Sequence, residues 1–210
     1  LSKKEKDSLQ KLPLKINFTP ESHSDGYATY FRGHLQKVMR KWVERHPKPN
    51  GEEYDIFRDG LKIYVTLDSR MQQYAEEAVN EHLANLQKFF FKEQKKNKTA
   101  PFYDIEKSQI KGILERAKRN SDRYKCLKNA GKSKKYIDQV FNKKTAMRVF
   151  SYKGDLDTIM SPNDSIKYYK FFLRSGLLSI EPQTGHIKAW VGGVNYKHFK
   201  YDAVKQQKRQ

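Results

Sequence analysis

Cysteine is nearly absent from the sequence, since Cys126 is the single one among 210 residues. One cysteine excludes an internal disulfide and a zinc site built on cysteine pairs. The six histidines show no ligand spacing such as His-x-x-x-His, so the sequence predicts no metal site and no cofactor. No signal peptide is present, and no apolar run is long enough to cross a bilayer.

Acidic residues are also scarce: 24 Asp and Glu stand against 43 Lys and Arg, a net charge of +19. Such an excess favours an anionic neighbour, either nucleic acid or the surface of an anionic bilayer. A solvated basic surface without a partner is the other interpretation. The sequence is 37% hydrophobic and 13% aromatic, which argues against wholesale disorder because these residues can build a core.

Nucleic-acid binding is the alternative function that the charge suggests. Aromatic residues interleave with lysines in two places, around Tyr169 and around Tyr196, and aromatic platforms with basic rims bind single strands. However, the basic residues are spread along the chain, and the sequence contains no recognisable nucleic-acid-binding motif. A basic nucleic-acid-binding α+β domain is therefore kept as the alternative and is disfavoured.

Alternating apolar residues predict the strands of a small antiparallel sheet. We expect strands at 61–67 and 147–152 and a hairpin over 177–192. The hairpin turn is Pro182-Gln183-Thr184-Gly185, in which proline presets φ and glycine accepts a positive φ. In the second strand of the hairpin, Ala189 and Val191 are expected on the buried face and Trp190 on the opposite face.

Helical spacing predicts an amphipathic helix from Tyr30 to Trp42 and a long one over 69–91, with Asp68 or Ser69 as its N-cap. The expected apolar stripe of the long helix includes Met71, Tyr74, Ala75, Val79, His82, Leu83, Leu86 and Phe89. Residues 92–145 read as a charged helical insertion, and Ser161-Pro162 starts a further helix. The predicted fold class is α+β, with the long helix packed on the small sheet.

Two blocks of the sequence carry a family resemblance. The first is GLKIYVTLDSRMQQYAEEAV at 60–79, and the second is LLSIEPQTGHIKAWVGGVNYKHFKYDAVKQQKRQ at 177–210. Together they resemble the lead-in and the opening of the transpeptidase domain of class A penicillin-binding proteins, the bifunctional bacterial cell-wall synthases. Residues 8–45 are similar to the junction that follows the glycosyltransferase in that family. Both blocks are architectural, and neither is a catalytic signature.

The resemblance implies four regions. Residues 1–52 are the end of the glycosyltransferase region and the interdomain linker, and 53–91 lead into the transpeptidase region. Residues 92–145 are the insertion, and 146–210 are the first transpeptidase strands, ending before the Ser-x-x-Lys motif. The implied role is a non-catalytic linker in a peptidoglycan synthase, at the extracytoplasmic face of the inner membrane. Its partners are the flanking catalytic domains, with the anionic membrane surface or peptidoglycan as further candidates.

A penicillin-reactive serine enzyme needs Ser-x-x-Lys, Ser-x-Asn and Lys-Thr/Ser-Gly in this order. Partial matches occur at Ser8-Leu9-Gln10-Lys11, Ser108-Gln109-Ile110-Lys111, Ser161-Pro162-Asn163 and Lys144-Thr145-Ala146. The last lacks the glycine and precedes the Ser-Pro-Asn, and chance explains Ser-x-x-Lys in so lysine-rich a chain. The Glu-Asp-x-x-Phe motif of the glycosyltransferase is missing too. We therefore predict no catalytic, cofactor-binding or metal-binding residues in this sequence.

Three further features have structural interpretations. Adjacent Glu76 and Glu77 point about 100° apart on a helix and are expected to be solvated. His82 is expected in the core or at its rim. Gly192-Gly193 has no phosphate-loop context, so tight backbone packing is the preferred explanation.

Overall fold

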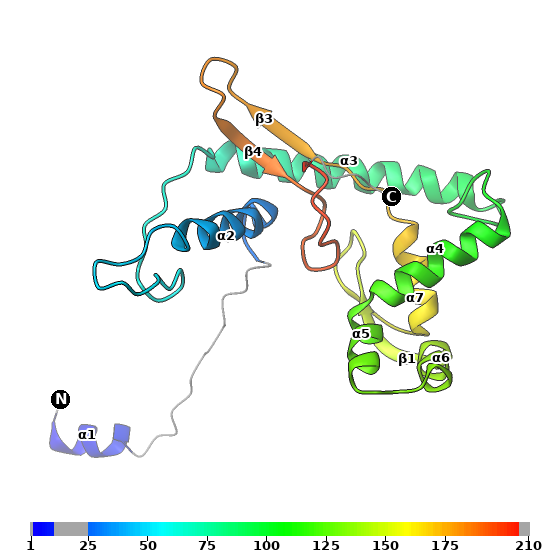
Figure 1. The fold of residues 1–210 in the computed structure, drawn as a ribbon, viewed down its shortest axis with the longest axis horizontal. Coiled ribbons are helices and arrows are strands. Elements are labelled where there is room, and N and C mark those ends of the chain that lie inside the picture. The colour runs from blue at the N-terminus through cyan, green and yellow to red at the C-terminus, as the bar shows by residue number, and fades with distance from the viewer. Residues whose placement is uncertain (1, 11–24, 206–210) are drawn as a thin grey trace.

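The computed structural model describes residues 2–10 and 25–205, which form a mixed helix and strand fold (Figure 1). This confirms the predicted α+β class. The helices are α1 (Lys3–Gln10), α2 (Thr29–Val43), α3 (Ser69–Gln94), α4 (Lys107–Asn120), α5 (Asp122–Asn129), α6 (Lys134–Asn142) and α7 (Pro162–Lys170). The strands are β1 (Thr145–Val149), β2 (Leu156–Met160), β3 (Leu177–Ile180) and β4 (Ile187–Val191). None of the helices in these two described stretches is long and apolar enough to span a membrane.

Helix α3 is the longest element, with 26 residues and a length of about 39 Å. It begins where the sequence predicts, because the Asp68 carboxylate accepts hydrogen bonds from the backbone N–H groups of Arg70 and Met71. These bonds, led by the one from Met71, hold the pKa of Asp68 below its usual value. The helix continues a few residues beyond the predicted end at 91.

The buried face of α3 differs from the predicted apolar stripe. Its buried residues are Gln72, Ala75, Val79, Leu83 and Gln87. Met71, Tyr74, Leu86 and Phe89 are exposed, as is His82, which corrects its expected place in the core. The apolar pattern covers more than half of the helix circumference, and contact with β4 and with the chain before β3 decides which part is covered.

Strands β3 and β4 form the predicted hairpin. Glu181 N–H donates to the His186 carbonyl (2.9 Å), and Gly185 adopts a φ of 71° in the turn. Ala189 and Val191 pack on Ala75, Val79 and Leu83 of α3. Trp190 on the opposite face is also buried, with 8% of its surface exposed, because α2 covers that face. Strand β4 is thus enclosed on both sides at Trp190.

The expected single sheet is in fact two separate two-stranded hairpins, β1–β2 and β3–β4. Residues 61–67 are extended but form no ladder, which corrects the strand predicted there. Near its end, the Thr66 hydroxyl donates to the Ile187 carbonyl (2.9 Å), and Asp68 N–H donates to the Lys188 carbonyl (3.0 Å). The earlier residues of the segment pass α2 and do not run along β4. They therefore have no strand to pair with.

The strand predicted at 147–152 is β1, which ends at Val149. Beyond it, Phe150 leaves the ladder and enters an aromatic cluster with Phe172 and Phe199. The ring centroids in this cluster lie between 5.1 and 5.8 Å apart, in mostly edge-to-face geometry that aromatic rings prefer. The cluster joins the β1–β2 hairpin, the end of α7 and the C-terminal loop into a second core.

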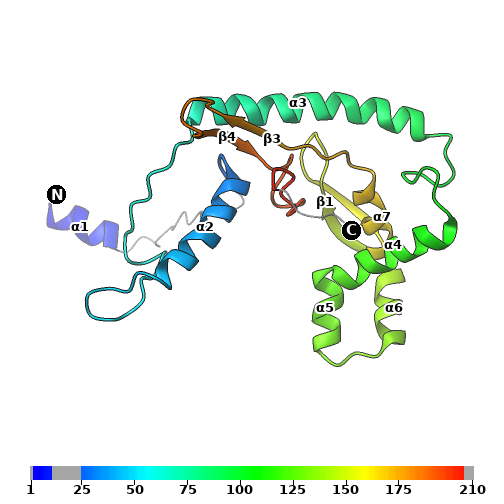
Figure 2. The same cartoon turned by 45° about the horizontal axis from the view of Figure 1, so that its top comes forward.

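Residues 92–145 contain the helices that the sequence predicts there. Helices α4 and α6 pack on α7, α5 contacts α4 and α6, and α5 and α6 run side by side away from α3 (Figure 2). Ile137 and Phe141 of α6 are buried, and Asn163 of α7 donates a hydrogen bond to Asn142 (2.8 Å). The segment is thus a small helical layer with its own apolar contacts.

We predict that Gln72→Ala destabilises the protein by about 2 to 3 kcal/mol. The Gln72 side chain is buried and bonds both backbone groups of Trp190, and each buried group left unpaired costs about 1–3 kcal/mol. The matched control is Gln73→Ala, whose partly exposed side chain bonds Glu77 alone and whose effect stays within about 0.5 kcal/mol. Urea unfolding measures both, and equal effects would contradict the prediction.

Candidate functional site

The motif-like serines lie apart and have structural roles. Ser161 is the N-cap of α7, where its hydroxyl accepts from Asp164 N–H (3.1 Å) and donates to the Asp164 carboxylate (2.6 Å). The hydrogen bond from the Ser161 hydroxyl, followed by the one from the Ser161 backbone N–H (3.3 Å), lowers the pKa of Asp164. Ser108 donates to Glu106 (3.2 Å) on the exposed start of α4, and Lys111 is exposed on the same helix.

The remaining motif matches are also peripheral. Ser8 lies on α1, and Lys11 falls outside the described residues. Lys144-Thr145-Ala146 leads into β1. No group of three or more histidine, cysteine or acidic side chains that could hold a metal ion occurs within 2–10 and 25–205. The predicted absence of a catalytic site stays a prediction.

A buried polar junction connects α2, α3 and β4. The Gln72 side chain donates to the Trp190 carbonyl (3.0 Å) and accepts from Trp190 N–H (2.7 Å). It also donates to Glu76 (2.8 Å), and the same Glu76 oxygen accepts from the backbone N–H of Ala28 (2.7 Å). Ala28 is the residue before α2, so one carboxylate fixes the start of α2 to α3. Glu76 is therefore a structural anchor, which corrects the expectation that it is solvated.

The ring of Trp190 closes this junction from the β4 side. It packs against Phe31 (centroids 5.9 Å apart) and stacks on His34 (5.4 Å), both on α2. Burial lowers the pKa of His34. The indole N–H donates to the Asp202 carboxylate at 3.1 and 3.2 Å, which satisfies the polar edge of the buried ring. The C-terminal loop is thereby tied to the same point.

Tyr30 and Gly192-Gly193 pack directly on each other. The Tyr30 hydroxyl donates to the Phe199 carbonyl (2.6 Å), and burial raises the pKa of Tyr30 well above its usual value. A Cβ atom added to Gly192 would lie 2.7 Å from the Tyr30 ring, and one on Gly193 would lie 2.5 Å from its hydroxyl oxygen. The preferred sequence interpretation, close backbone packing, is what the structure shows.

A second polar cluster links the turn before β2, α7 and the C-terminal loop. Phe150 N–H donates to the Tyr169 hydroxyl (3.2 Å), which leaves that hydroxyl's proton for His198 Nδ1 (2.9 Å). His198 Nε2 lies 2.8 Å from Asp155, so the chain of bonds fits the tautomer with its proton on Nε2. Lys197 also donates to Asp155 (2.7 Å). This cluster resembles a proton relay in outline, but a nucleophile is not among its members.

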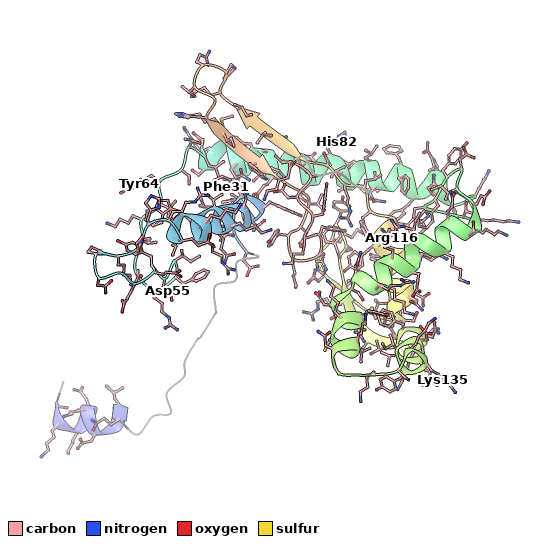
Figure 3. The ribbon with its side chains drawn as sticks, viewed as in Figure 1. Phe31, Asp55, Tyr64, His82, Arg116 and Lys135 are labelled. Atoms are coloured by element: carbon pink, nitrogen blue, oxygen red, sulfur yellow. The ribbon has the colours of Figure 1, made fainter. Side chains whose placement is uncertain are left out.

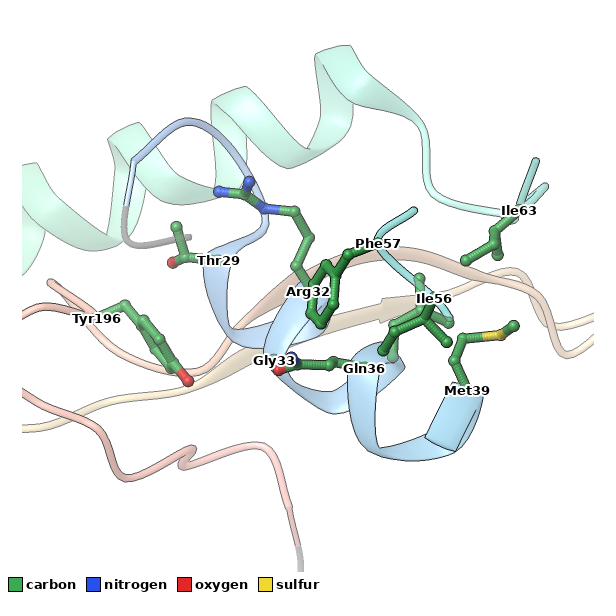
Figure 4. Close-up of a pocket in the computed structure, with 10 residues that line it drawn as sticks. Thr29, Arg32, Gly33, Gln36, Met39, Ile56, Phe57, Ile63 and Tyr196 are labelled. Carbon is green, nitrogen blue, oxygen red and sulfur yellow. The ribbon is translucent and has the colours of Figure 1, made fainter. Parts of the chain in front are cut away.

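A pocket of about 180 Å³ lies between α2 and the segment that leads to α3 (Figure 4). It is lined by Thr29, Arg32, Gly33, Leu35, Gln36, Met39, Ile56, Phe57, Ile63 and Tyr196. The one charged group is Arg32, whose guanidinium donates to the Asp25 carbonyl. Ile63, which was expected in a strand, lies in the wall of this pocket instead. The mainly apolar lining provides no pair of side chains for acid–base catalysis.

Comparison with known families identifies part of the chain. Residues 97–173 match the family model described as the penicillin-binding protein middle domain. This segment is similar to the middle domain of penicillin-binding proteins. No curated protein and no solved structure matches the chain. The suggested kinship with penicillin-binding proteins is thereby confirmed.

The middle domain comprises α4 to α7 and the β1–β2 hairpin. Most of it is the stretch that the sequence analysis describes as an insertion, and it lies between the two blocks that carried the resemblance. No short motif marks it. The similarity to the family model extends over all of residues 97–173. A search for single motifs by residue spacing does not detect similarity of this kind.

We predict that Asp155 contributes to the loss of unfolding free energy at low pH. Hydrogen bonds from Lys197 and then His198 hold the pKa of Asp155 below its usual value of 3.8. Its contribution to stability is therefore present above pH 3.8 and is lost as pH falls through the lower folded-state pKa. Asp155→Asn should flatten the decline of unfolding free energy between about pH 5 and pH 2.

Urea unfolding across this pH range measures the effect, with Asp7→Asn on the exposed helix α1 as the control. The control should keep the wild-type slope. A slope for Asp155→Asn that matches the wild type would show that the cluster does not couple folding to proton binding.

Proposed function

We propose that the chain is the central, non-catalytic region of a class A penicillin-binding protein, in which it links a peptidoglycan glycosyltransferase to a transpeptidase. The middle domain supports the assignment to a penicillin-binding protein. The linking role is carried by one observation, the buried junction that locks α2 onto α3 and β4 through Glu76 and Trp190.

The junction joins the two regions that such a linker must hold. Helix α2 belongs to the part that the resemblance assigns to the interdomain linker, and β3–β4 to the part assigned to the transpeptidase. A flexible tether would let these regions rotate freely. Here the Ala28–Glu76–Gln72–Trp190 hydrogen bonds and the stacked ring of His34 fix their relative orientation.

In this role the region holds two active sites at a defined separation. The parent protein polymerises glycan strands from lipid II and cross-links their D-Ala-D-Ala peptides, and a strand leaving the first site reaches the second. The partners are the two catalytic domains, and the location is the extracytoplasmic face of the inner membrane.

The 210-residue chain should not be acylated by a β-lactam, because the Ser108 hydroxyl lies on the exposed start of α4 and donates its proton to the Glu106 carboxylate, not to a base in a cleft. Incubation with a fluorescent penicillin should leave it unlabelled, while the full-length protein that contains it is labelled. Labelling of the 210-residue chain at Ser108 would overturn the non-catalytic role, and an unlabelled full-length protein would overturn the parent activity.

Loosening the junction should uncouple the two activities of the full-length protein. Glu76→Ala removes the anchor of Ala28, so we expect cross-linking of newly made strands to fall about twofold or more as the effective concentration of strand at the second site drops. Penicillin acylation and glycan polymerisation, measured separately, should be unchanged.

The matched control is Glu77→Ala, which removes the neighbouring carboxylate that contacts Gln73 on the exposed face of α3. It should keep cross-linking at the wild-type level. Equal cross-linking in both variants would show that the junction does not transmit orientation, and a joint loss of acylation would point to misfolding of the transpeptidase instead.

A further inference from the structure

The positive charge is concentrated in one part of the molecule. Residues 92–145 contain 17 Lys and Arg against 6 Asp and Glu, a net charge of +11 out of the chain's +19. This count corrects the expectation that the basic residues are spread evenly along the chain. Just over half of the excess charge lies in about a quarter of the residues.

Within this part, the charge peaks at the hairpin formed by α5, α6 and their connecting turn. We name residues 123–135 the basic hairpin; it holds six cations and no acid. All six are exposed: Arg123, Lys125, Lys128, Lys132, Lys134 and Lys135. Figure 2 shows the hairpin projecting away from α3, and Figure 3 places Lys135 at its far end. A projecting basic end is accessible to a large partner.

Three acids lie near the basic hairpin without forming an ion pair with it, although Asp122 begins α5 and the charges of Asp138 and Lys134 attract each other. Asp138 forms its ion pair with the buried Lys118 (2.5 Å), and Glu115 lies 3.4 Å from Arg119 and 4.0 Å from Lys118. The hydrogen bond from Lys118 lowers the pKa of Asp138. Across the described residues, none of the six hairpin cations pairs with a carboxylate within 4.0 Å. Their charge is therefore available to a partner.

The hairpin displays these cations on a folded base. Ser121 and Ser133 cap α5 and α6 by accepting from the N–H groups of Tyr124 and Tyr136 (3.3 Å each). Phe141 is buried beneath them and contacts the Tyr124 ring (centroids 6.4 Å apart). The backbone that carries the lysines is thus fixed, so binding has to order side chains alone.

Several of the cations converge on a recess of about 550 Å³ between α4, α5 and α6. Its lining holds four cations and one acid, together with the Tyr124 ring and the Asn129 amide: Arg119, Lys125, Lys128, Lys134 and Glu115, of which Glu115 is paired with Arg119. A phosphate group placed there meets several donors at once. The recess is a second indication, besides net charge, that the hairpin suits phosphate-bearing ligands.

We infer that the basic hairpin is a docking surface for an anionic phospholipid bilayer. A dense planar array of phosphates attracts a cluster of four to eight cations without requiring a shaped groove. Tyr136 is 46% exposed beside the lysines, and Lys132 lies over its ring at 5.6 Å, a pair suited to the headgroup region. This inference does not depend on the scaffold role proposed above.

Nucleic acid fits the surface less well. Single strands need a groove with a row of aromatic platforms, whereas the one exposed ring next to the basic hairpin is that of Tyr136. Duplex DNA is read by a helix lying in the major groove, and α5 and α6 are only 8 and 9 residues long. Binding to DNA is therefore kept as an outcome of the test.

The test is co-sedimentation of the 210-residue chain with phosphatidylcholine vesicles, with and without phosphatidylglycerol. We expect binding only when phosphatidylglycerol is present, and weaker binding as salt rises. Replacing Lys125, Lys128, Lys132, Lys134 and Lys135 by Gln should lower the partition coefficient at least about a hundredfold. Replacing the same five by Arg keeps the charge and should keep the binding.

The matched control replaces Lys3, Lys4, Lys6, Lys41 and Lys62 by Gln, five exposed lysines elsewhere in the chain, and reaches the same net charge. It should bind within a few-fold of the wild type, and circular dichroism checks that every variant is folded. An equal loss in the control, or equal binding to pure phosphatidylcholine, would overturn the inference. Tighter binding to a DNA oligonucleotide through the same five lysines would overturn it in favour of nucleic acid.

Discussion

Two buried glutamines on one helix hold the rest of the structure in place. Gln72 and Gln87 are each 1% exposed, and each uses both ends of its amide on the backbone of another segment. Gln72 brackets Trp190 in β4, while Gln87 donates to the Phe171 carbonyl (2.9 Å) and accepts from Leu173 N–H (2.8 Å). Because a buried amide left unpaired is costly, these bonds fix which face of α3 is covered.

Helix α3 therefore acts as a common base for two cores. Near its start, Gln72 and Glu76 tie it to β4 and α2, where the ring of Trp190 is enclosed. Near its end, Gln87 ties it to the chain after α7, next to the aromatic cluster of the middle domain. Helix α2 and the segment similar to the penicillin-binding protein middle domain are both bound to this helix, and the hydrogen bond from Tyr30 to the Phe199 carbonyl also joins α2 to the aromatic cluster.

Local chemistry made much of the fold predictable. The Asp68 cap, the Ser161-Pro162 start of α7 and the Pro182–Gly185 turn each act within a few residues, and the structure contains all three. The candidate site was less predictable. Glu76 and Gln72 look like surface residues in a helix, and no rule of spacing indicates that Ala28, far away in sequence, supplies a donor to Glu76.

The sequence alone determined the class of the fold, the starts of α3 and α7 and the β3–β4 hairpin, because caps, turns and periodicity act locally, and its motifs indicated the kinship with penicillin-binding proteins. Only the tertiary structure decided that residues 61–67 pass α2 and add no third strand to the β3–β4 hairpin, that Trp190 is enclosed on its outer face, and that the six cations of residues 123–135 lie on a projecting hairpin. These outcomes depend on which distant segment competes for a surface, and that competition is settled by packing between segments.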